Sequence, residues 1–311
     1  MTTTQFDLVL LGEPLVEVST TEAFRHGAHG VLGVSGDVVN AGAAAAAAGA
    51  SVALIARVSD DELGDAVCRR IRELGIDDTY IRRVPGQQGV YFLHIDPEGN
   101  RQFSYARAGS VGSQLDVADL PEGVIEQAGA VLGGGIAAAL SSTLARTMLH
   151  AAQRSGRFVY DPNFRPRLTT ADQARAFLQS VAPCTEVMVP SAPSEIELLL
   201  GTGEPETAAA SLMGWGARSV VVTQGSEGSS IFTAAGTSHQ PVIPALDVID
   251  QTGAGDVFAG TLTARLALGD DLREAAALAA AAASLSVGGR GGTGLIAPLS
   301  EIQRHRERVT T

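Results

Sequence analysis

The sequence predicts an α/β fold, in which crossover helices accompany a mostly parallel sheet and a small β-strand lid stands beside it. Short apolar runs alternate with helical segments along most of the chain, as is typical of a parallel sheet with crossover helices. Two strand-like runs within residues 89–107 break this alternation, and a hairpin at such a place projects from the sheet. A glycine-rich loop at residues 250–256 then opens the helical C-terminal part.

The N-terminal part supplies the first strands and helices of the core. Residues 6–11 form an apolar run that ends at Gly12 and predicts a buried strand. Residues 20–36 are polar and weakly patterned, so the strands expected there lie outside the main sheet. A helix rich in alanine, a strand and a second helix follow at residues 38–50, 51–58 and 60–75. We assign the acidic residues at the start of the second helix to capping and packing rather than to catalysis.

The lid is predicted from a hairpin pattern. Two strand-like runs at residues 89–96 and 101–107 are joined by Pro97-Glu-Gly-Asn100, which is a turn signal. We expect one domain, residues 1–311, whose lid comprises approximately residues 13–36 and 87–108 and whose remainder forms the α/β core.

Strands and helices alternate again after the hairpin. Strands are predicted at residues 130–132, 157–160, 186–189 and 219–223, with helices between them at residues 142–154, 171–181, 194–200 and 205–215. Two runs at residues 229–232 and 238–243 are expected as antiparallel edge strands. Two helices, at about residues 255–268 and 272–287, follow the glycine-rich loop.

Composition narrows the classes of function. The 311 residues carry a formal net charge of −12, which argues against nucleic acid or an anionic membrane as a partner. The chain contains no lysine, because all 22 of its Lys and Arg residues are arginine. Mechanisms that need a catalytic lysine, such as a Walker-type phosphate loop, a protein-kinase strand lysine or Schiff-base chemistry, are therefore excluded.

The sequence carries no pattern of export or of membrane insertion. Two cysteines, Cys68 and Cys184, lack the spacing of metal ligands and are expected as free thiols. The N-terminus is polar and leads straight into a strand, unlike a signal peptide. No apolar run has the length that a bilayer span needs. We therefore expect a cytoplasmic protein that does not bind membranes.

The loop Asp250-Gln-Thr-Gly-Ala-Gly-Asp256 is the clearest functional signal. Three small residues, Gly253, Ala254 and Gly255, open a helix, so several backbone N–H groups are directed at one spot that suits an anion. A carboxylate beside such an anion site, that of Asp256, fits a base that takes a proton from an attacking hydroxyl. The alternative is an ordinary glycine turn with an acid in the first helical turn.

This loop, continued through Val-Phe-Ala-Gly260, resembles the signature of the ribokinase-like (PfkB-type) carbohydrate kinases. The resemblance implies that Gly253, Ala254 and Gly255 form the anion hole for the transferred phosphate and that Asp256 is the catalytic base. It also implies a three-layer, ribokinase-like α/β core that binds a sugar beneath the lid, with ATP and Mg2+ as cofactors. A monovalent cation is a further candidate cofactor.

Two further segments resemble parts of that family that face the sugar: Val34-Ser-Gly-Asp-Val-Val-Asn40, and Gly133-Gly-Gly-Ile136, which is expected as a glycine-rich turn after a strand. Within the family, the segments most similar to the 2-keto-3-deoxygluconate kinases are Gln88-Gly-Val-Tyr91, Tyr105-Ala-Arg107-Ala-Gly-Ser and Asp161-Pro-Asn-Phe-Arg165. The resemblance implies that the substrate contacts Gly36, Asn40, Tyr91, Tyr105, Arg107, Ile136 and Arg165. Two arginines in one cleft would suit the carboxylate of a sugar acid.

The substrate residues also have simpler interpretations, which the sequence leaves open. Asn40 would serve equally well as a cap of the Ala-rich helix. Arg107 would be a solvated charge at a strand end, and Arg165 a loop arginine paired with an acid. Ser35 stands where the family usually has the first glycine of a pair.

The nucleotide side is predicted from weaker motifs. Thr223-Gln-Gly225-Ser-Glu-Gly228 resembles the family segment near the nucleotide phosphates, and its alternative is an ordinary hairpin turn. Residues 290–298 would close over the adenine. Glu195 is implied as an indirect contact of Mg2+, although the Asn that many relatives place before this Glu is absent here.

The resemblance thus implies an ATP-dependent kinase that phosphorylates a primary hydroxyl of a sugar acid, with 2-keto-3-deoxygluconate as the first candidate. A fructokinase, ribokinase or nucleoside kinase of the same fold is the alternative. A non-catalytic sensor of sugar or nucleotide is the alternative from another class. A dinucleotide-binding oxidoreductase is disfavoured, because no Gly-x-Gly-x-x-Gly follows the first strand. Exposed strand edges in the lid would suit a homodimer.

Overall fold

The structure, a computed structural model, describes residues 5–96 and 101–310, without the side chains of residues 309 and 310. The turn predicted at residues 97–100 therefore lies outside the described residues. Within the described part, none of the helices combines the length and the hydropathy that a bilayer span requires.

The core of the fold is one large sheet. Its strands among the described residues are β1 (Leu8–Leu11), β4 (Val52–Ser59), β5 (Ile76–Asp77), β6 (Ile81–Val84), β9 (Ala130–Gly134), β10 (Phe158–Asp161), β11 (Val187–Met188), β12 (Ser219–Thr223), β13 (Ser229–Thr233) and β14 (Gly236–Gln240). The order is β14-β13-β12-β11-β10-β9-β1-β4-β5, with β6 also beside β4. Neighbouring strands pair in parallel from β12 through β5, whereas the pairs β12–β13 and β13–β14 are antiparallel.

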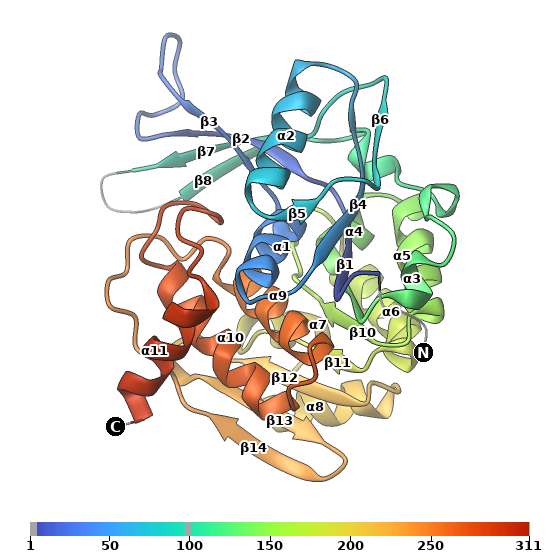
Figure 1. The fold of residues 1–311 in the computed structure, drawn as a ribbon, viewed down its shortest axis with the longest axis vertical. Helices are drawn as coiled ribbons and strands as arrows, with labels where there is room; N and C mark the ends of the chain where they lie inside the picture. The colour runs from blue at the N-terminus through green and yellow to red at the C-terminus, as the bar shows by residue number, and fades with distance from the viewer. Residues whose placement is uncertain (1–4, 97–100, 311) are drawn as a thin grey trace.

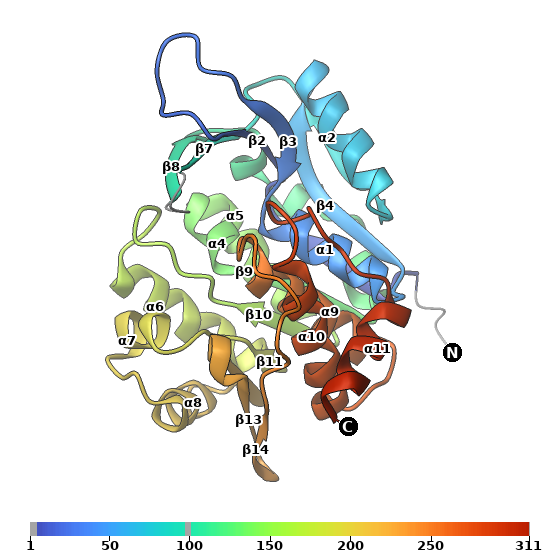
Figure 2. The same ribbon diagram turned by 90° about the vertical axis from the view of Figure 1, so that its left-hand side faces the viewer.

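Helices cover both faces of this sheet. They are α1 (Asp37–Ala47), α2 (Glu62–Glu73), α3 (Val124–Gln127), α4 (Gly135–Leu140), α5 (Ser142–Arg154), α6 (Ala171–Val181), α7 (Ser194–Leu200), α8 (Pro205–Gly214), α9 (Ala254–Ala267), α10 (Leu272–Ser286) and α11 (Leu299–Thr310). Helices α1, α2, α9 and α10 pack on one face and α3 to α8 on the other (Figures 1 and 2). Helix α11 packs against α10.

Strand β1 shows why the layers form. All four of its side chains are buried, and successive side chains of a strand point to opposite faces. Leu8 and Leu10 accordingly join the core beneath α1 and α9, whereas Val9 and Leu11 join the core beneath α5. A strand that is apolar on both faces must be covered on both, which is the three-layer arrangement predicted from the sequence. The predicted fold class is confirmed.

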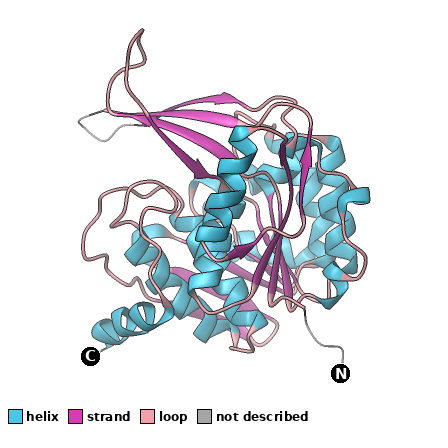
Figure 3. Cartoon of the chain, turned by 45° about the horizontal axis from the view of Figure 1, so that its top comes forward, coloured by secondary structure: helices cyan, strands magenta, loops and turns pink. Residues whose placement is uncertain are grey.

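A second, four-stranded sheet stands off the core. Its strands are β2 (Leu15–Thr20), β3 (Val31–Ser35), β7 (Val90–Ile95) and β8 (Arg101–Ala106), in the order β3-β2-β7-β8 (Figures 1 and 3). Leu15, Tyr91 and Leu93 are buried together on one face. These strands lie within the two segments predicted for the lid, and we keep that name for the sheet. Its movement during a reaction stays a prediction.

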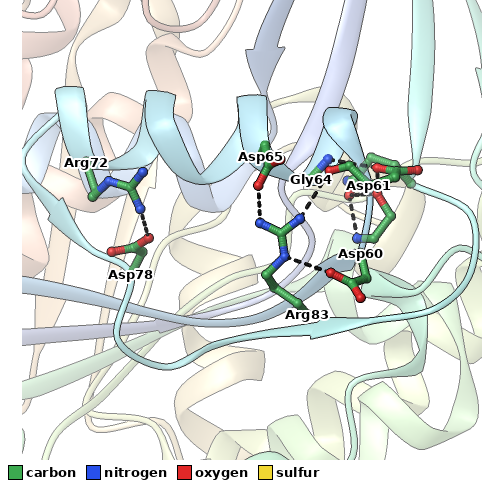
Figure 4. Close-up of polar contacts among 9 residues, drawn as sticks. Asp60, Asp61, Gly64, Asp65, Arg72, Asp78 and Arg83 are labelled. Carbon is green, nitrogen blue, oxygen red and sulfur yellow. Dashed lines mark hydrogen bonds and ion pairs between the residues drawn. The ribbon is translucent and has the colours of Figure 1, made fainter.

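Several elements were not predicted, because tertiary contacts rather than local patterns stabilise them. Strands β5 and β6 are only two and four residues long. Arg83 on β6 pairs with Asp65 and Asp60 and donates to the carbonyl of Asp61, so β6 is anchored to α2 (Figure 4). Helices α3, α4 and α11 were also missed, the first two being too short to show a helical period.

The structure confirms one local prediction, the cap of α2, and contradicts another, the turn at residues 133–136. Asp61 caps α2, because its carboxylate accepts a hydrogen bond of 3.0 Å from the N–H of Gly64, which confirms the assignment to capping (Figure 4). The glycine-rich turn expected at residues 133–136 is wrong. Strand β9 runs to Gly134 and α4 begins at Gly135, whose added Cβ would lie 1.8 Å from the carbonyl of Pro162. Close approach of two backbones, not a turn, requires that glycine.

Candidate active site

A cavity of about 690 Å³ lies between the lid and the core. It opens where β10, β11 and β12 end, which is the usual ligand crevice of an open parallel sheet. Of the residues predicted for the site, it is lined by Gly36, Asn40, Tyr91, Tyr105, Arg107, Ile136, Arg165, Glu195, Thr223, Gly253, Gly255 and Asp256. Ala254, Gly225 and Gly228 are not among its lining residues. The fold thus brings most of the predicted residues into one space, while their roles stay predictions.

The glycine-rich loop ends in an array of free backbone donors. Gly253 has φ 80° and precedes the first residue of α9, a conformation that glycine adopts without strain. Among the described residues, no hydrogen-bond acceptor is found for the backbone N–H groups of Gly253, Gly255 and Asp256. The N–H of Ala254 differs, because it donates to the carbonyl of Gln251 at 3.3 Å. We call the three unpaired N–H groups the anion hole; they lie at the positive end of the helix dipole.

Asp256 lies in the first turn of α9 and is held by two amides. The side-chain nitrogen of Asn40 donates to one carboxylate oxygen at 2.8 Å, and that of Asn163 donates to the other at 3.0 Å. Burial, and after it the nearby carboxylate of Asp37, raise the pKa of Asp256 to about 6, although the two amides and Arg165 oppose the rise. The carboxylate is therefore oriented and poised close to neutral pH, as a general base needs to be.

Asn40 reaches Asp256 because two glycines leave room for its side chain. The cap of α1 is Gly36, so the alternative that Asn40 caps this helix is wrong. A Cβ on Gly292 would lie 2.2 Å from the side-chain nitrogen of Asn40, and one on Gly253 would lie 3.2 Å from it. Ser35, in place of the usual glycine, offers its hydroxyl to the amide oxygen of Asn40 at a long 3.4 Å. Because a carboxylate only accepts hydrogen bonds, the amide nitrogen of Asn40 faces Asp256 and its oxygen faces Ser35.

Asn163 was missed from the sequence, although it lies within a motif that was recognised. Its φ of 39° is in the left-handed region, where Asn is better tolerated than most residues. The carboxylate of Asp161 accepts from its N–H at 3.0 Å. The Asp-x-Asn spacing is the signal that could have suggested such a turn. The turn is what points the amide of Asn163 at Asp256.

Glu195 organises the loop around Asn163. Its carboxylate accepts from the N–H of Phe164 at 2.6 Å and from the N–H of Ser191 at 2.7 Å. Burial raises the pKa of Glu195, whereas these backbone donors oppose the rise. Because both of its oxygens are engaged, Glu195 is suited to an indirect contact with a metal ion rather than to direct ligation.

The two predicted carboxylate-binding arginines differ in their surroundings. Arg165 makes one hydrogen bond, of 3.1 Å, to the carbonyl of its neighbour Phe164, and no ion pair to it is found among the described residues. Its guanidinium is therefore available to a ligand. Arg107 is buried and donates to Glu13 at 2.8 and 2.5 Å, and the hydroxyl of Ser110 donates to the same carboxylate. The charge of Arg107 is thus largely neutralised inside the protein.

This pairing predicts that Arg107→Ala acts mainly on stability. Removing the guanidinium leaves the carboxylate of Glu13 buried without its cation, and breaking such a pair costs about 3–5 kcal/mol. We expect urea denaturation to show a loss of this size. The double variant Arg107→Met with Glu13→Gln should recover most of it. Equal losses in the single and double variants would contradict this account.

The lid brings two tyrosines to the site, and it contacts the glycine-rich loop of the core through Arg101. The Tyr91 hydroxyl donates to Glu17 within the lid, and burial raises the pKa of Tyr91. Tyr105, 40% exposed, lies beside Tyr91 at a ring-centroid distance of 6.2 Å. Arg101 on β8 donates to the hydroxyl of Thr252 at 2.7 Å and lies 3.2 Å from the carboxylate of Asp250. The lid therefore touches the loop that carries the anion hole, a contact that sequence alone did not reveal.

The predicted nucleotide residues are only partly in the cavity. Thr223 lines it at the end of β12, whereas Gly225 and Gly228 belong to the turn between β12 and β13. Gly228 has φ 87°, and a Cβ there would lie 2.2 Å from the carbonyl of Gln240. The hairpin itself therefore accounts for Gly228. Asp250, in contrast, ties residues 290–298 to the site, because it accepts from the N–H of Gly291 at 2.8 Å.

Comparison with known proteins gives one family. A family model described as pfkB family carbohydrate kinase matches residues 6–298. The chain is 36% identical to a 2-dehydro-3-deoxygluconokinase from Thermoproteus tenax over 91% of its own length and 89% of that protein. It is 29% identical to a 2-dehydro-3-deoxygalactonokinase from Haloferax volcanii over 96% of each chain. Among solved structures, a protein from E. coli named ribokinase II, in complex with ATP and Mg2+, superposes with a TM-score of 0.86 at 25% identity, over 97% of this chain and 99% of that chain.

Proposed function

Because the chain belongs to the pfkB family of carbohydrate kinases, we propose that it transfers the γ-phosphate of ATP to a primary hydroxyl of a sugar acid. The first candidate is 2-keto-3-deoxygluconate, also called 2-dehydro-3-deoxygluconate, with the 6-hydroxyl as acceptor. One observation carries this proposal: the oriented carboxylate of Asp256 shares a cavity with the anion hole and with the unpaired guanidinium of Arg165.

We assign a part of the transfer to each group. Asp256 accepts the proton of the attacking hydroxyl while the O–P bond forms. The anion hole donates to the phosphoryl oxygens as negative charge builds on them, and its N–H groups need no reorganisation to do so. With no lysine in the chain, these N–H groups, arginine and the metal supply the positive field. Arg165 would hold the acid end of the sugar, so that the far hydroxyl meets Asp256.

ATP and Mg2+ are the cofactors of this proposal. Among the described residues, no group of three or more His, Cys, Asp or Glu side chains could hold a metal. Mg2+ commonly binds one or two carboxylates together with substrate phosphates, so the cavity fits it. Burial and repulsion from Glu195 and Asp256 raise the pKa of Asp161 well above its usual value, which a cation would offset. Asp161, with Glu195 through water, would hold the ion, whose charge would stabilise the phosphates. A monovalent cation remains a further candidate.

A neutral ketose is the second candidate acceptor. The observation that favours it is the pairing of Arg107 with Glu13, so that of the two arginines predicted to bind the acid only Arg165 lacks an acidic partner among the described residues. A non-catalytic sensor is disfavoured, because a sensor needs no base held by two amides.

We also propose that two copies of the chain form a homodimer by pairing their lids. Strand β3 is at the edge of the lid sheet, and its Val31 and Leu32 are 70% and 54% exposed.

A panel of acceptors tests the proposed function. We expect ATP-dependent phosphorylation of 2-keto-3-deoxygluconate with a kcat/KM well above those for fructose, ribose and nucleosides, measured by ADP release and by phosphorus NMR of the product. A higher kcat/KM for fructose or ribose would mean that a neutral sugar, and not the sugar acid, is the preferred acceptor. ATP binding without transfer to any acceptor would favour the sensor.

The pH dependence of kcat/KM should follow Asp256. Its pKa is raised to about 6 by burial, and only the deprotonated carboxylate accepts a proton. Activity is therefore expected to be full above this pKa and to fall about tenfold per pH unit below it. A profile for the preferred sugar at saturating Mg-ATP checks this. An acidic limb near the ordinary pKa of an aspartate would show that Asp256 is not the group that titrates.

A further inference from the structure

Asp37 is a carboxylate in the active-site cavity that the proposed reaction has not yet used. It is the first residue of α1 and follows Gly36, whose φ is 124°. It lines the cavity together with Asn40, Arg107, Arg165 and Asp256. One of its carboxylate oxygens would lie 3.0 Å from a Cβ added to Gly134, so it faces the end of β9. An acid at the start of a helix has an ordinary explanation, so the sequence alone does not single out Asp37.

The hydrogen bonds of Asp37 are incomplete. The backbone N–H of Val38 and its own N–H interact with the carboxylate. Among the described residues, no side chain is found to donate a hydrogen bond to it. Arg107 and Arg165 lower its pKa by their charge but only partly oppose the effect of burial, which raises it. A desolvated carboxylate at a cavity wall lacks donors that a ligand could supply.

We propose that Asp37 is a specificity residue of the proposed reaction, and that it accepts a hydrogen bond from a non-reacting hydroxyl of the sugar. The inference rests on the proposed function. In 2-keto-3-deoxygluconate the hydroxyls other than the reacting one are those at carbons 4 and 5. Arg165 would hold the acid end and Asp256 the reacting end. Asp37 would then read the hydroxylated part between them.

Asp37 also acts on Asp256 through its charge. The groups that face Asp256 are Asp37 from α1, Asp161 from the end of β10 and Arg165 from the following loop, besides the amides of Asn40 and Asn163. Arg107 and Glu13 in turn face Asp37. Asp37 raises the pKa of Asp256 by repulsion. Neutralising Asp37 should therefore lower that pKa, because Arg165 and the amides then act unopposed by this neighbour.

The test compares Asp37→Asn and Asp37→Ala with the wild type. Because the alanine variant loses a hydrogen bond between the sugar and a charged acceptor, we expect its kcat/KM for the sugar to fall about 10- to 100-fold. The asparagine variant should lose less, since its carbonyl still accepts a weaker bond. Both losses should appear mainly in KM for the sugar, with KM for ATP unchanged. In both variants the acidic limb of the pH profile should move to lower pH.

The matched control is Glu62→Gln. Glu62 is the first residue of α2 and lies outside the cavity. A role for Asp37 limited to the helix dipole predicts similar small stability losses in Glu62→Gln and Asp37→Asn, with the sugar KM and the acidic limb unmoved. That result would overturn the inference while leaving the proposed function intact. If the wild type phosphorylates no sugar, the proposed function fails, and the inference fails with it.

Discussion

Asp256→Asn should lower kcat by about 10²- to 10⁴-fold, the usual contribution of a general base, while KM for ATP changes little. The amide cannot take the proton of the attacking hydroxyl at neutral pH. It also disturbs the two donors that now meet the carboxylate, because Asn40 and Asn163 both present N–H groups to it. The backbone N–H groups of the anion hole remain, so binding of the nucleotide should survive.

Single-turnover transfer and calorimetric titration of ATP together measure this result. The control is Asp270→Asn. Asp270 lies just beyond the other end of α9 and pairs with Arg265 at 2.7 Å. That variant should keep its turnover. Near-wild-type turnover in Asp256→Asn would refute the assignment of the base. Loss of ATP binding would instead show that Asp256 mainly supports the loop.

Arg165→Ala should raise KM for the sugar acid about 10- to 100-fold and leave kinetics with a neutral ketose nearly unchanged. Arg165 has no ion-pair partner among the described residues, so the substitution breaks no salt bridge. Its charge does lower the pKa of Asp256 and of Asp37, so both acceptors are compared at a pH well above the acidic limb. For this reason it is a cleaner test of carboxylate binding than Arg107→Ala. In Arg107→Ala, the unpaired Glu13 would confuse stability with affinity.

The comparison requires both acceptors in the same preparation of the variant. Arg69→Ala serves as the control for removal of a positive charge, because Arg69 is exposed on α2 outside the cavity. It should alter neither KM. An equal loss for the acid and the ketose in Arg165→Ala would mean that Arg165 shapes the cavity rather than recognises the acid. An unchanged KM for both acceptors would mean that a group other than Arg165 binds the carboxylate of the sugar acid.

Local pattern was sufficient for the larger elements and for the loop at their centre. Residues 8–11, 52–59 and 219–223 are strands because apolar runs of that length can be buried on both faces. The turn at Gly253 was readable because glycine, a helix start and a carboxylate occur together. Short elements such as β6 and α4 were not readable, since their stability comes from Arg83 and from backbone contact at Gly135.

By itself, the sequence determined the larger strands and helices, the absence of lysine, and a loop in which a glycine-rich helix start precedes a carboxylate. Only the tertiary structure decided which side chains surround that carboxylate. In it, Asn40 and Asn163 donate to Asp256, Glu13 pairs with Arg107, and Arg165 has no acidic partner within the part of the chain that the structure describes. The physical reason is that hydrogen bonds and ion pairs depend on distances of a few ångströms between residues far apart in the chain. A periodicity or a motif records local conformation, whereas these partners are chosen when the layers pack.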